Sequence, residues 1–213
     1  MSVEPAHGMP LRPPQPRGTV YRRFLPALAS TFSLRVADID RDLARFHDWM
    51  NQARVHRFWE LAGDLASHRE YLRRQLDHAS SLPLIGEFDC EPFAYFEVYW
   101  AKEDRIAPHC DAGDFDRGCH VLVGESRFRG PARLDGWLDG LMHYMFLDEP
   151  RTQRIVGEPR VDNERFIRVL QQHGFDRRKD FDFPHKRAAL MVLERETFTA
   201  RSASWTEAAG GTA

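Results

Sequence analysis

One segment in the middle of the chain constrains the fold most, because it combines a strand, a glycine-containing loop, a long helix and a second strand. The apolar run 119–124 is typical of a buried strand. Glycine and proline follow it, and apolar residues then recur at helical spacing over 134–145, ahead of a short strand at 154–156. Strands joined through a helix lie parallel and need a crossover connection. The sequence therefore predicts that residues 117–124 and 153–158 are neighbouring parallel strands.

Further strands and helices are predicted around this unit. Apolar and alternating patterns predict strands at 31–37, 82–86, 92–100 and 187–193. Predicted helices start at Asp40 as an N-cap, at Ser67, whose spacing to Glu70 matches a capping box, and at Asn163. This order implies an α/β (α+β) fold in which helices cover both faces of a sheet.

The two ends of the chain differ from its middle. Residues 1–30 carry six of the 13 prolines, and proline lacks an N–H donor and disfavours helix in the residue before it. We expect residues 1–30 to be a proline-rich arm, partly disordered, that ends by lying on the domain. Residues 31–200 are the predicted domain, and the small residues of 201–213 predict a flexible tail.

Composition narrows the class of protein. The chain has 30 Lys and Arg and 32 Asp and Glu, so it lacks the strongly positive net charge that is typical of a nucleic-acid binder. Three cysteines, an odd number, disfavour a disulfide framework and favour a reducing compartment. The sequence has no apolar run of about 18 residues and no apolar signal segment near its start. We expect a cytoplasmic protein without nucleic-acid or membrane partners, and the oligomeric state stays open.

The loop before the long helix reads Arg127-Phe128-Arg129-Gly130-Pro131-Ala132. A glycine turn at a helix start brings backbone N–H groups close to a phosphate, and the helix N-terminus adds partial positive charge. The arginines add charge-assisted contacts, whereas Pro131 contributes no N–H. An ordinary strand-to-helix turn is the alternative interpretation of this hexapeptide alone.

The hexapeptide resembles the R-x-x-G-x-A loop of the GCN5-related N-acetyltransferases (GNAT), and the sequence R-I-V-G-E-P that starts at Arg154 resembles their next strand. Residues 81–86, 95–106, 111–120 and 128–131 together resemble the siderophore-biosynthesis acyltransferases of the aerobactin and alcaligin pathways and the mycobactin lysine acyltransferase. The resemblance covers about residues 34–195 and leaves out the proline-rich arm.

This resemblance implies the GNAT fold, a central mixed sheet in which two parallel strands splay around the pantetheine arm of the cofactor. It implies acyl transfer from acyl-CoA, either acetyl-CoA or succinyl-CoA, to an amine or to the hydroxylamine nitrogen of an N-hydroxylated lysine or diamine. The hydroxylated acceptor gives a hydroxamate, and the enzyme itself needs no metal. The cofactor-binding residues carried over from the motif, or placed beside it, are Leu122, Val123, Arg127, Phe128, Arg129, Gly130, Ala132 and Asn163.

Two residues are the candidates for catalysis. His120 occupies the Gly-x-His position of the resembling family, and Glu158 lies where the mycobactin enzyme has an aspartate. We interpret Glu158 as the proton acceptor and His120 as the group that binds or orients the acceptor nitrogen. The reverse assignment stays open, because imidazole titrates near neutral pH. A hydrogen-bonded buried histidine and a capping or salt-bridged glutamate are the structural alternatives.

Candidate substrate-binding residues precede the histidine. Asp111 and Asp116 belong to an acidic segment that we expect to face a cationic amine, and Trp100, with Tyr99 and Phe96, is a candidate wall of the acceptor pocket. A solvated loop and plain core are the alternatives. The adjacent His–Cys pairs at 109–110 and 119–120 lack the ligand spacing of a zinc site. The acidic segment also lacks the glycine of a calcium loop.

Two further function classes remain open at this point. One is a GNAT acetyltransferase that acts on another amine, such as an aminoglycoside or a protein N-terminus. The other is a non-catalytic CoA-fold module that binds a partner.

Overall fold

The computed structural model describes residues 10–209, with only the backbone for 203–209. The strands of this part are β1 Thr19–Leu25, β2 Ser30–Val36, β3 Ser81–Phe88, β4 Glu91–Trp100, β5 Arg117–Val123, β6 Arg154–Gly157, β7 Asp176–Phe183 and β8 Lys186–Glu194. The helices are α1 Ile39–Met50, α2 Ala53–Trp59, α3 Leu65–Asp77, α4 Ala107–Cys110, α5 Pro131–Asp148, α6 Glu164–Gln172 and α7 Arg195–Ala209. Short 3₁₀ turns also occur, among them η2 Ala101–Glu103 and η3 Ser126–Phe128.

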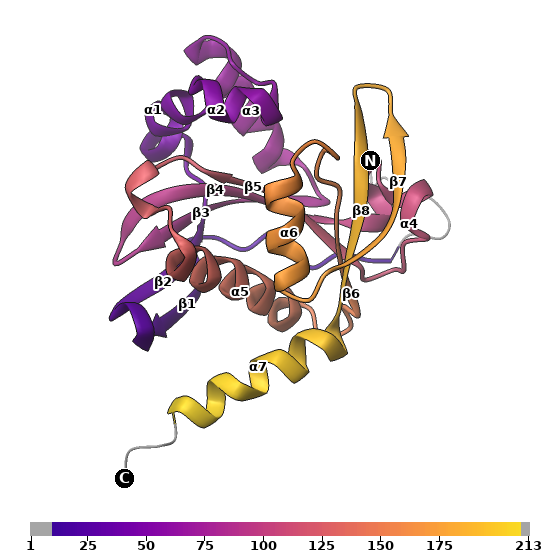
Figure 1. Ribbon diagram of the computed structural model, residues 1–213. Coiled ribbons are helices and arrows are strands. Elements are labelled where there is room, and N and C mark those ends of the chain that lie inside the picture. Colours follow the sequence, from indigo (N-terminus) through magenta and orange to yellow (C-terminus); the bar gives the residue numbers. More distant parts are fainter. Residues whose placement is uncertain (1–9, 210–213) are drawn as a thin grey trace.

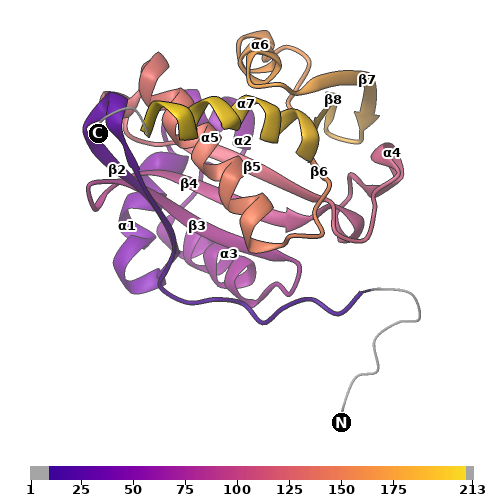
Figure 2. The same ribbon diagram turned by 90° about the horizontal axis from the view of Figure 1, so that it is seen from below.

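The described strands form one mixed sheet of eight strands in the order β1-β2-β3-β4-β5-β6-β8-β7. Helices α1 and α3 lie on one face of this sheet, and α5 and α7 lie on the other (Figures 1 and 2). Strand β4 shows why both faces are covered, since successive side chains of a strand point to opposite faces. Tyr95 is buried with Phe46 of α1, and the next residue, Phe96, stacks on Trp137 of α5.

Strands β5 and β6 confirm the prediction of neighbouring parallel strands that diverge. They pair in parallel only at Arg117 with Ile155 and at Gly118 with Val156. Past Gly118 the two strands are unpaired, and β5 keeps only its antiparallel partner β4, up to Val123. Helix α6 follows β6 and lies alongside this opening (Figure 1). The opening leaves one edge of β5 without a strand partner.

The expected domain boundaries were wrong within the described residues. Strand β1 belongs to the sheet, so the sheet begins at Thr19 and not after residue 30. Before it, Arg12 pairs with Glu103 at 2.6 Å and stacks on Trp100, so this part of the arm lies on the domain. At the other end, the expected boundary at residue 200 falls inside α7. The expectations for residues 1–9 and 210–213 lie outside the described residues.

Several local predictions also needed correction. Helix α1 is capped by Asp38, which accepts the N–H of Arg41, and not by Asp40. Helix α3 is capped by Asp64, which accepts the N–H of Ser67, so Ser67 and Glu70 form no capping box. Helix α2 and strand β7 were not predicted. In the described part of the chain, no helix combines the length and apolarity that crossing a membrane requires.

Candidate active site

A long cleft follows the opening between β5 and β6. It consists of two adjoining cavities of about 450 and 560 Å³. We call the smaller one the loop cavity, because Arg129, Gly130 and Pro131 border it, and the larger one the histidine cavity, because it surrounds His120. The residues that border both cavities are Phe58, Trp59, Val121, Asn163 and Phe166. The two cavities therefore lie next to each other along the open edge of β5.

The loop cavity contains most of the residues predicted to bind the cofactor. The predicted residues that border it are Leu122, Val123, Phe128, Arg129, Gly130 and Asn163. Arg127 and Ala132 do not border it, so their predicted contacts are not supported. The turn η3 directs the Arg127 side chain to the surface, where it forms an ion pair with Glu91.

The start of α5 is built to receive an anion. Gly130 has φ 142°, a conformation that favours glycine, and no side chain caps the first turn, which leaves its N–H groups without a cap. The guanidinium of Arg54 donates to the carbonyl of Val123 at 2.7 Å. Burial, and then the nearby charge of Arg129, lower the pKa of Arg54. Two neighbouring cations at a helix N-terminus favour a bound phosphate group.

The free edge of β5 supplies backbone donors to the cleft. The N–H of Gly124 donates to the carbonyl of Phe93 on β4, and backbone groups alternate along a strand. Leu122 therefore points its N–H toward β4, whereas Val121 and Val123 point theirs into the cleft. Trp59 and Arg54 accordingly reach the carbonyls of these two residues from the open side, at 3.3 and 2.7 Å. Of the two predicted donors, Val123 thus directs its N–H into the cleft and Leu122 does not, and neither Val121 nor Arg54 was predicted.

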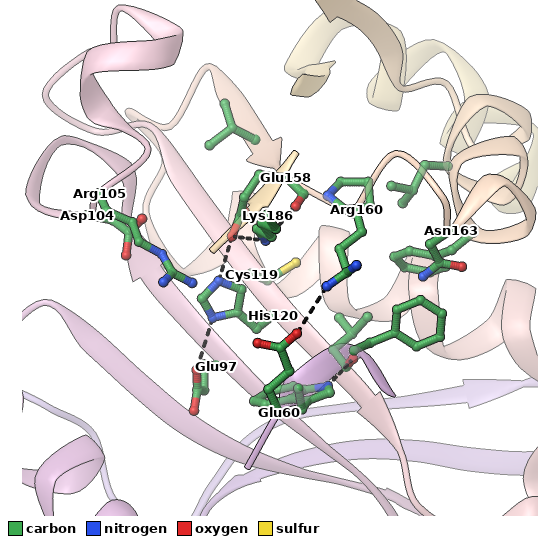
Figure 3. A pocket seen from close by; sticks show the side chains of 18 of the residues that line it. Glu60, Glu97, Asp104, Arg105, Cys119, His120, Glu158, Arg160, Asn163 and Lys186 are labelled. Carbon is green, nitrogen blue, oxygen red and sulfur yellow. Dashed lines mark hydrogen bonds and ion pairs between the residues drawn. The ribbon is translucent and has the colours of Figure 1, made fainter. Parts of the chain in front are cut away.

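The two predicted catalytic residues lie together in the histidine cavity. His120 Nε2 is 2.9 Å from Oε1 of Glu158. On the other side of the ring, His120 Nδ1 is 3.0 Å from Oε2 of Glu97 (Figure 3). The Glu158 and Glu97 side chains are only 1% and 5% exposed, while the imidazole between them is 25% exposed. An imidazole held between two buried carboxylates donates from both nitrogens when it is protonated.

The electrostatics of this trio favour an imidazolium. Burial by itself lowers the pKa of an imidazole, but the charge of Glu158 and the hydrogen bonds to both carboxylates raise the pKa of His120 to about 10. Burial by itself raises the pKa of a carboxyl, but His120, with Lys186 and Tyr99, holds the pKa of Glu158 well below its usual range. At neutral pH the site therefore contains a charged ring and an ionised Glu158.

Tyr99 and Lys186 complete the contacts of Glu158. The hydroxyl of Tyr99 donates to Oε2 of Glu158 at 2.9 Å, and the ammonium of Lys186 donates to its backbone carbonyl at 2.8 Å. Tyr99 lies across Gly118, where an added Cβ would meet its ring at 2.3 Å. Any larger residue at that position would displace the tyrosine from Glu158. Gly118 therefore belongs to the construction of the site.

Three contacts of the site were missed by sequence reasoning. Glu97 was the one with a signal, since it is a carboxylate inside the otherwise apolar strand β4. Tyr99 was expected only as a possible cavity wall and not as a partner of Glu158. Lys186, at the start of β8, carried no local signal, because only the tertiary fold brings it to Glu158.

The residues predicted to bind the substrate lie elsewhere. Trp100 is buried under the guanidinium groups of Arg12 and Arg117, at 4.2 and 4.6 Å from the ring centre. Asp116 is buried in an ion pair with Arg154, and the same arginine binds the carbonyl of Asp111. These contacts hold the segment before β5, and none of the three predicted residues borders either cavity. Their predicted substrate contacts were wrong for this cleft.

Within the described residues, no group of three or more His, Cys, Asp or Glu side chains is arranged to hold a metal ion. His109 stacks on Phe181 with ring centres 4.2 Å apart, whereas His120 contacts two carboxylates. The two His–Cys pairs therefore do not meet in one site.

Comparisons with known proteins agree with this geometry. Residues 38–183 match the family model described as an acetyltransferase (GNAT) domain. The N(6)-hydroxylysine O-acetyltransferase of Escherichia coli is 49% identical over 189 residues, which cover 89% of this chain and 60% of that protein. The N(5)-hydroxyornithine:cis-anhydromevalonyl coenzyme A-N(5)-transacylase of Beauveria bassiana is 45% identical over 193 residues, 89% of this chain and 42% of that protein. The chain thus spans less than two thirds of either relative.

One solved structure is similar to this chain over most of that structure's length. The aminoglycoside acetyltransferase AAC(6')-Ib, crystallised in complex with coenzyme A, has a TM-score of 0.71 and 25% sequence identity to this chain. The similarity covers 79% of this chain and 98% of that one.

Proposed function

The chain belongs to the GNAT acetyltransferase family, and from this we propose that it transfers an acyl group from acyl-CoA to the hydroxylamine nitrogen of an N-hydroxylated lysine or diamine. The product is a hydroxamate, an iron(III) ligand, so the reaction belongs to siderophore biosynthesis. The observation that carries the proposal is the 2.9 Å contact between Glu158 and His120 at the end of the splayed strands, a contact that holds the pKa of Glu158 well below its usual range. Acyl-CoA is an intracellular thioester, which supports a cytoplasmic location.

The loop cavity fits the donor. Its helix N-terminus and the cations Arg54 and Arg129 suit the phosphates of CoA. The free N–H groups of Val121 and Val123 suit the pantetheine arm and the thioester oxygen, which becomes an oxyanion when nitrogen attacks. The structure of AAC(6')-Ib in complex with coenzyme A supports a coenzyme A thioester as the donor.

Glu158 suits a weakly basic acceptor. A hydroxylamine is much less basic than an alkylamine, so it reaches the site already neutral. Its nitrogen attacks the thioester carbon, the N–H proton passes to Glu158, and the C–S bond breaks, so that this proton ends on the thiol of CoA. The nitrogen of the tetrahedral intermediate is cationic and strongly acidic, and even a carboxylate of depressed pKa accepts its proton. The same carboxylate is a poor base for an alkylammonium ion.

The names of the relatives support a hydroxylated amino acid as acceptor but mention both O- and N-transfer. One assay decides between these outcomes. Acetyl-CoA and succinyl-CoA are each combined with N6-hydroxylysine, N-hydroxyputrescine and N-hydroxycadaverine, and the released CoA thiol is measured. The expected result is that the amount of hydroxamate, measured by the absorbance of its ferric complex, equals the amount of released thiol. Thiol release with an O-acyl product, or no turnover with any hydroxylated acceptor, would contradict the proposal.

The likeness to an aminoglycoside acetyltransferase supports a second candidate, acetylation of a polycationic amine. The cations that border the histidine cavity, Arg105, Arg160 and Lys186, are balanced by the carboxylates Glu60, Glu97, Asp104 and Glu158, so the lining charge does not select between the two acceptors. The selection comes from Glu158, whose depressed pKa makes it a poor base for an alkylammonium ion. We therefore expect kanamycin to be a poorer acceptor than the hydroxylated amines when the same thiol assay compares them.

Replacing Gly130 with Val tests the donor site. A Cβ at Gly130 meets no protein atom within 4 Å, so the added side chain projects into open space where the phosphates are proposed to bind. We expect acyl-CoA binding, measured by calorimetry, to weaken by at least about tenfold, or about 1.4 kcal/mol. The affinity for a truncated acyl thioester, which lacks the nucleotide, is expected to fall less in this variant.

The matched control for this test is Gly18→Val. Gly18 also has a positive φ and no atom within 4 Å of an added Cβ, but it does not border the loop cavity. This variant shares the backbone strain without the contact to the phosphates. Unchanged acyl-CoA affinity in a folded Gly130→Val protein, or an equal loss in both variants, would disprove the assignment of the loop.

A further inference from the structure

A buried polar cluster lies on the side of His120 away from Glu158. The Oε1 atom of Glu97 accepts the hydroxyl of Tyr71 at 2.6 Å and the hydroxyl of Tyr95 at 2.9 Å. Its Oε2 atom contacts His120 Nδ1 at 3.0 Å. Tyr71 comes from α3 and Tyr95 from β4, so two packed elements fix one carboxylate (Figure 3 shows its position below the ring).

Among the described residues, Glu97 forms no ion pair with a lysine or an arginine. Glu87 is equally buried but pairs with Arg35 at 2.7 Å. A buried carboxylate without a cation is costly unless a charged hydrogen-bond partner compensates it. Within the described part of the chain, the one group in contact with Glu97 that can carry positive charge is the imidazole of His120.

We propose that Glu97 is a positioning residue for the acyl transfer, which anchors His120 from the side opposite Glu158 and keeps both ring nitrogens engaged. This inference rests on the function proposed above. The ring then has no nitrogen left to hold the acceptor. Its second N–H is directed at Glu158 and keeps that carboxylate ionised and in place. His120 thus acts through Glu158, and the earlier interpretation of His120 as the group that grips the acceptor nitrogen is replaced.

Other titratable groups around the ring come from five elements. They are Tyr99 on β4, Cys119 on β5, Glu158 after β6, Lys186 on β8 and Asp104 after η2. Burial, and then the charge of Glu158, raise the pKa of Tyr99, and burial raises the pKa of Cys119 to about 12. Burial raises the pKa of Asp104, and burial lowers the pKa of Lys186. Of these groups, only Glu158 also hydrogen-bonds to the ring.

The test measures the ring itself. Histidine-labelled protein is titrated by NMR without substrate, and the His120 signal is identified by its loss in His120→Gln. In the native protein we expect the ring to stay protonated through neutral pH. In Glu97→Gln we expect the titration midpoint of the His120 ring to fall by at least about one pH unit. The reason is that a carboxylate in contact with an imidazole raises the imidazole pKa by about one to three units.

Two variants separate charge from packing. Glu97→Asp keeps the charge but moves the carboxylate away from the ring by one methylene, so its midpoint is expected to lie above that of Glu97→Gln. Tyr95→Phe removes a hydrogen bond to Glu97 but not its charge, and no downward shift is expected. We expect kcat/KM to fall at high pH, where the His120 ring loses its proton. If this fall moves to lower pH in Glu97→Gln together with the NMR midpoint, the positioning role is supported.

An unchanged midpoint in folded Glu97→Gln, or a native ring that titrates like an ordinary histidine, would overturn the inference. The inference would also be overturned if the NMR midpoint shifts while the pH at which kcat/KM falls does not change. The NMR titration needs no turnover. If the midpoint shifts as expected but no hydroxylated acceptor is acylated, it is the proposed function that fails.

Discussion

Replacing Glu158 with Gln should lower kcat for the hydroxylated acceptor on the order of 10²–10⁴-fold, the usual loss when a general base is removed. The amide keeps the shape of the side chain but cannot take the proton from the acceptor nitrogen. Glu158 does not border the loop cavity, so the Kd of acyl-CoA should change little. Steady-state kinetics with acetyl-CoA and N6-hydroxylysine, together with calorimetry, measure both quantities.

The control for this variant is Glu194→Gln. Glu194 ends β8 and pairs with Arg178 at the surface, away from both cavities, so its loss changes charge without touching the site. A fall in kcat of less than about tenfold in folded Glu158→Gln, with normal acyl-CoA binding, would assign the proton to another group.

Replacing His120 with Ala should lower the unfolding free energy by about 3 kcal/mol at neutral pH. The change removes the cation between two buried carboxylates, and such a loss costs about 3–5 kcal/mol. Without this cation, burial raises the pKa of Glu158, so in the variant the carboxyl takes up a proton as pH falls and the uncompensated charge disappears. The deficit of the variant should therefore be larger at about pH 7 than at about pH 4, as measured by urea unfolding.

A double variant separates charge from packing in this test. If uncompensated charge causes the loss, His120→Ala combined with Glu158→Gln should be more stable than His120→Ala alone. A deficit that is the same at both pH values, or a double variant that loses the sum of the single losses, would show that the imidazole stabilises the fold only by packing.

The crossover unit was predictable because its signals are local. An apolar strand, a glycine turn and an amphipathic helix follow one another, and right-handed crossover geometry then brings β5, which carries His120, next to β6, which Glu158 directly follows. Strands β5 and β6 pair at only two positions, and beyond these positions they diverge, as the family resemblance implied. The cleft lies along this divergence. The meeting of histidine and carboxylate at 2.9 Å followed from this geometry.

One edge strand of the sheet, β7, was missed because most of its residues are charged. It reads Asp-Arg-Arg-Lys-Asp-Phe-Asp-Phe, and only Phe181 and Phe183 are buried. Charged residues on an edge strand prevent pairing with other chains, so an edge strand can have the composition of a loop. The other edge strand, β1, contains apolar residues but directly follows a proline-rich segment, and the prediction merged it with that segment.

The part of the site that sequence could not give depends on tertiary contacts. Glu97 is separated from His120 by 23 residues and from Tyr71 by 26, and its carboxylate is useful only because the fold joins all three. Trp100, Asp111 and Asp116 had the composition of an amine site, but Arg12 and Arg117 cover the Trp100 ring. Arg154 pairs with the Asp116 carboxylate and binds the backbone carbonyl of Asp111. Local composition cannot show which charges the fold has already paired.

The central claim is that this site acylates a hydroxylamine because its proton acceptor, Glu158, is weakly basic. The most direct test compares kcat/KM for N6-hydroxylysine and lysine from about pH 6.5 to about pH 9, where lysine keeps its ammonium proton up to about pH 10. We predict a nearly flat profile for hydroxylysine above neutral pH and, for lysine, a much lower value that rises with pH. Equal values, or identical pH profiles for the two acceptors, would contradict the account.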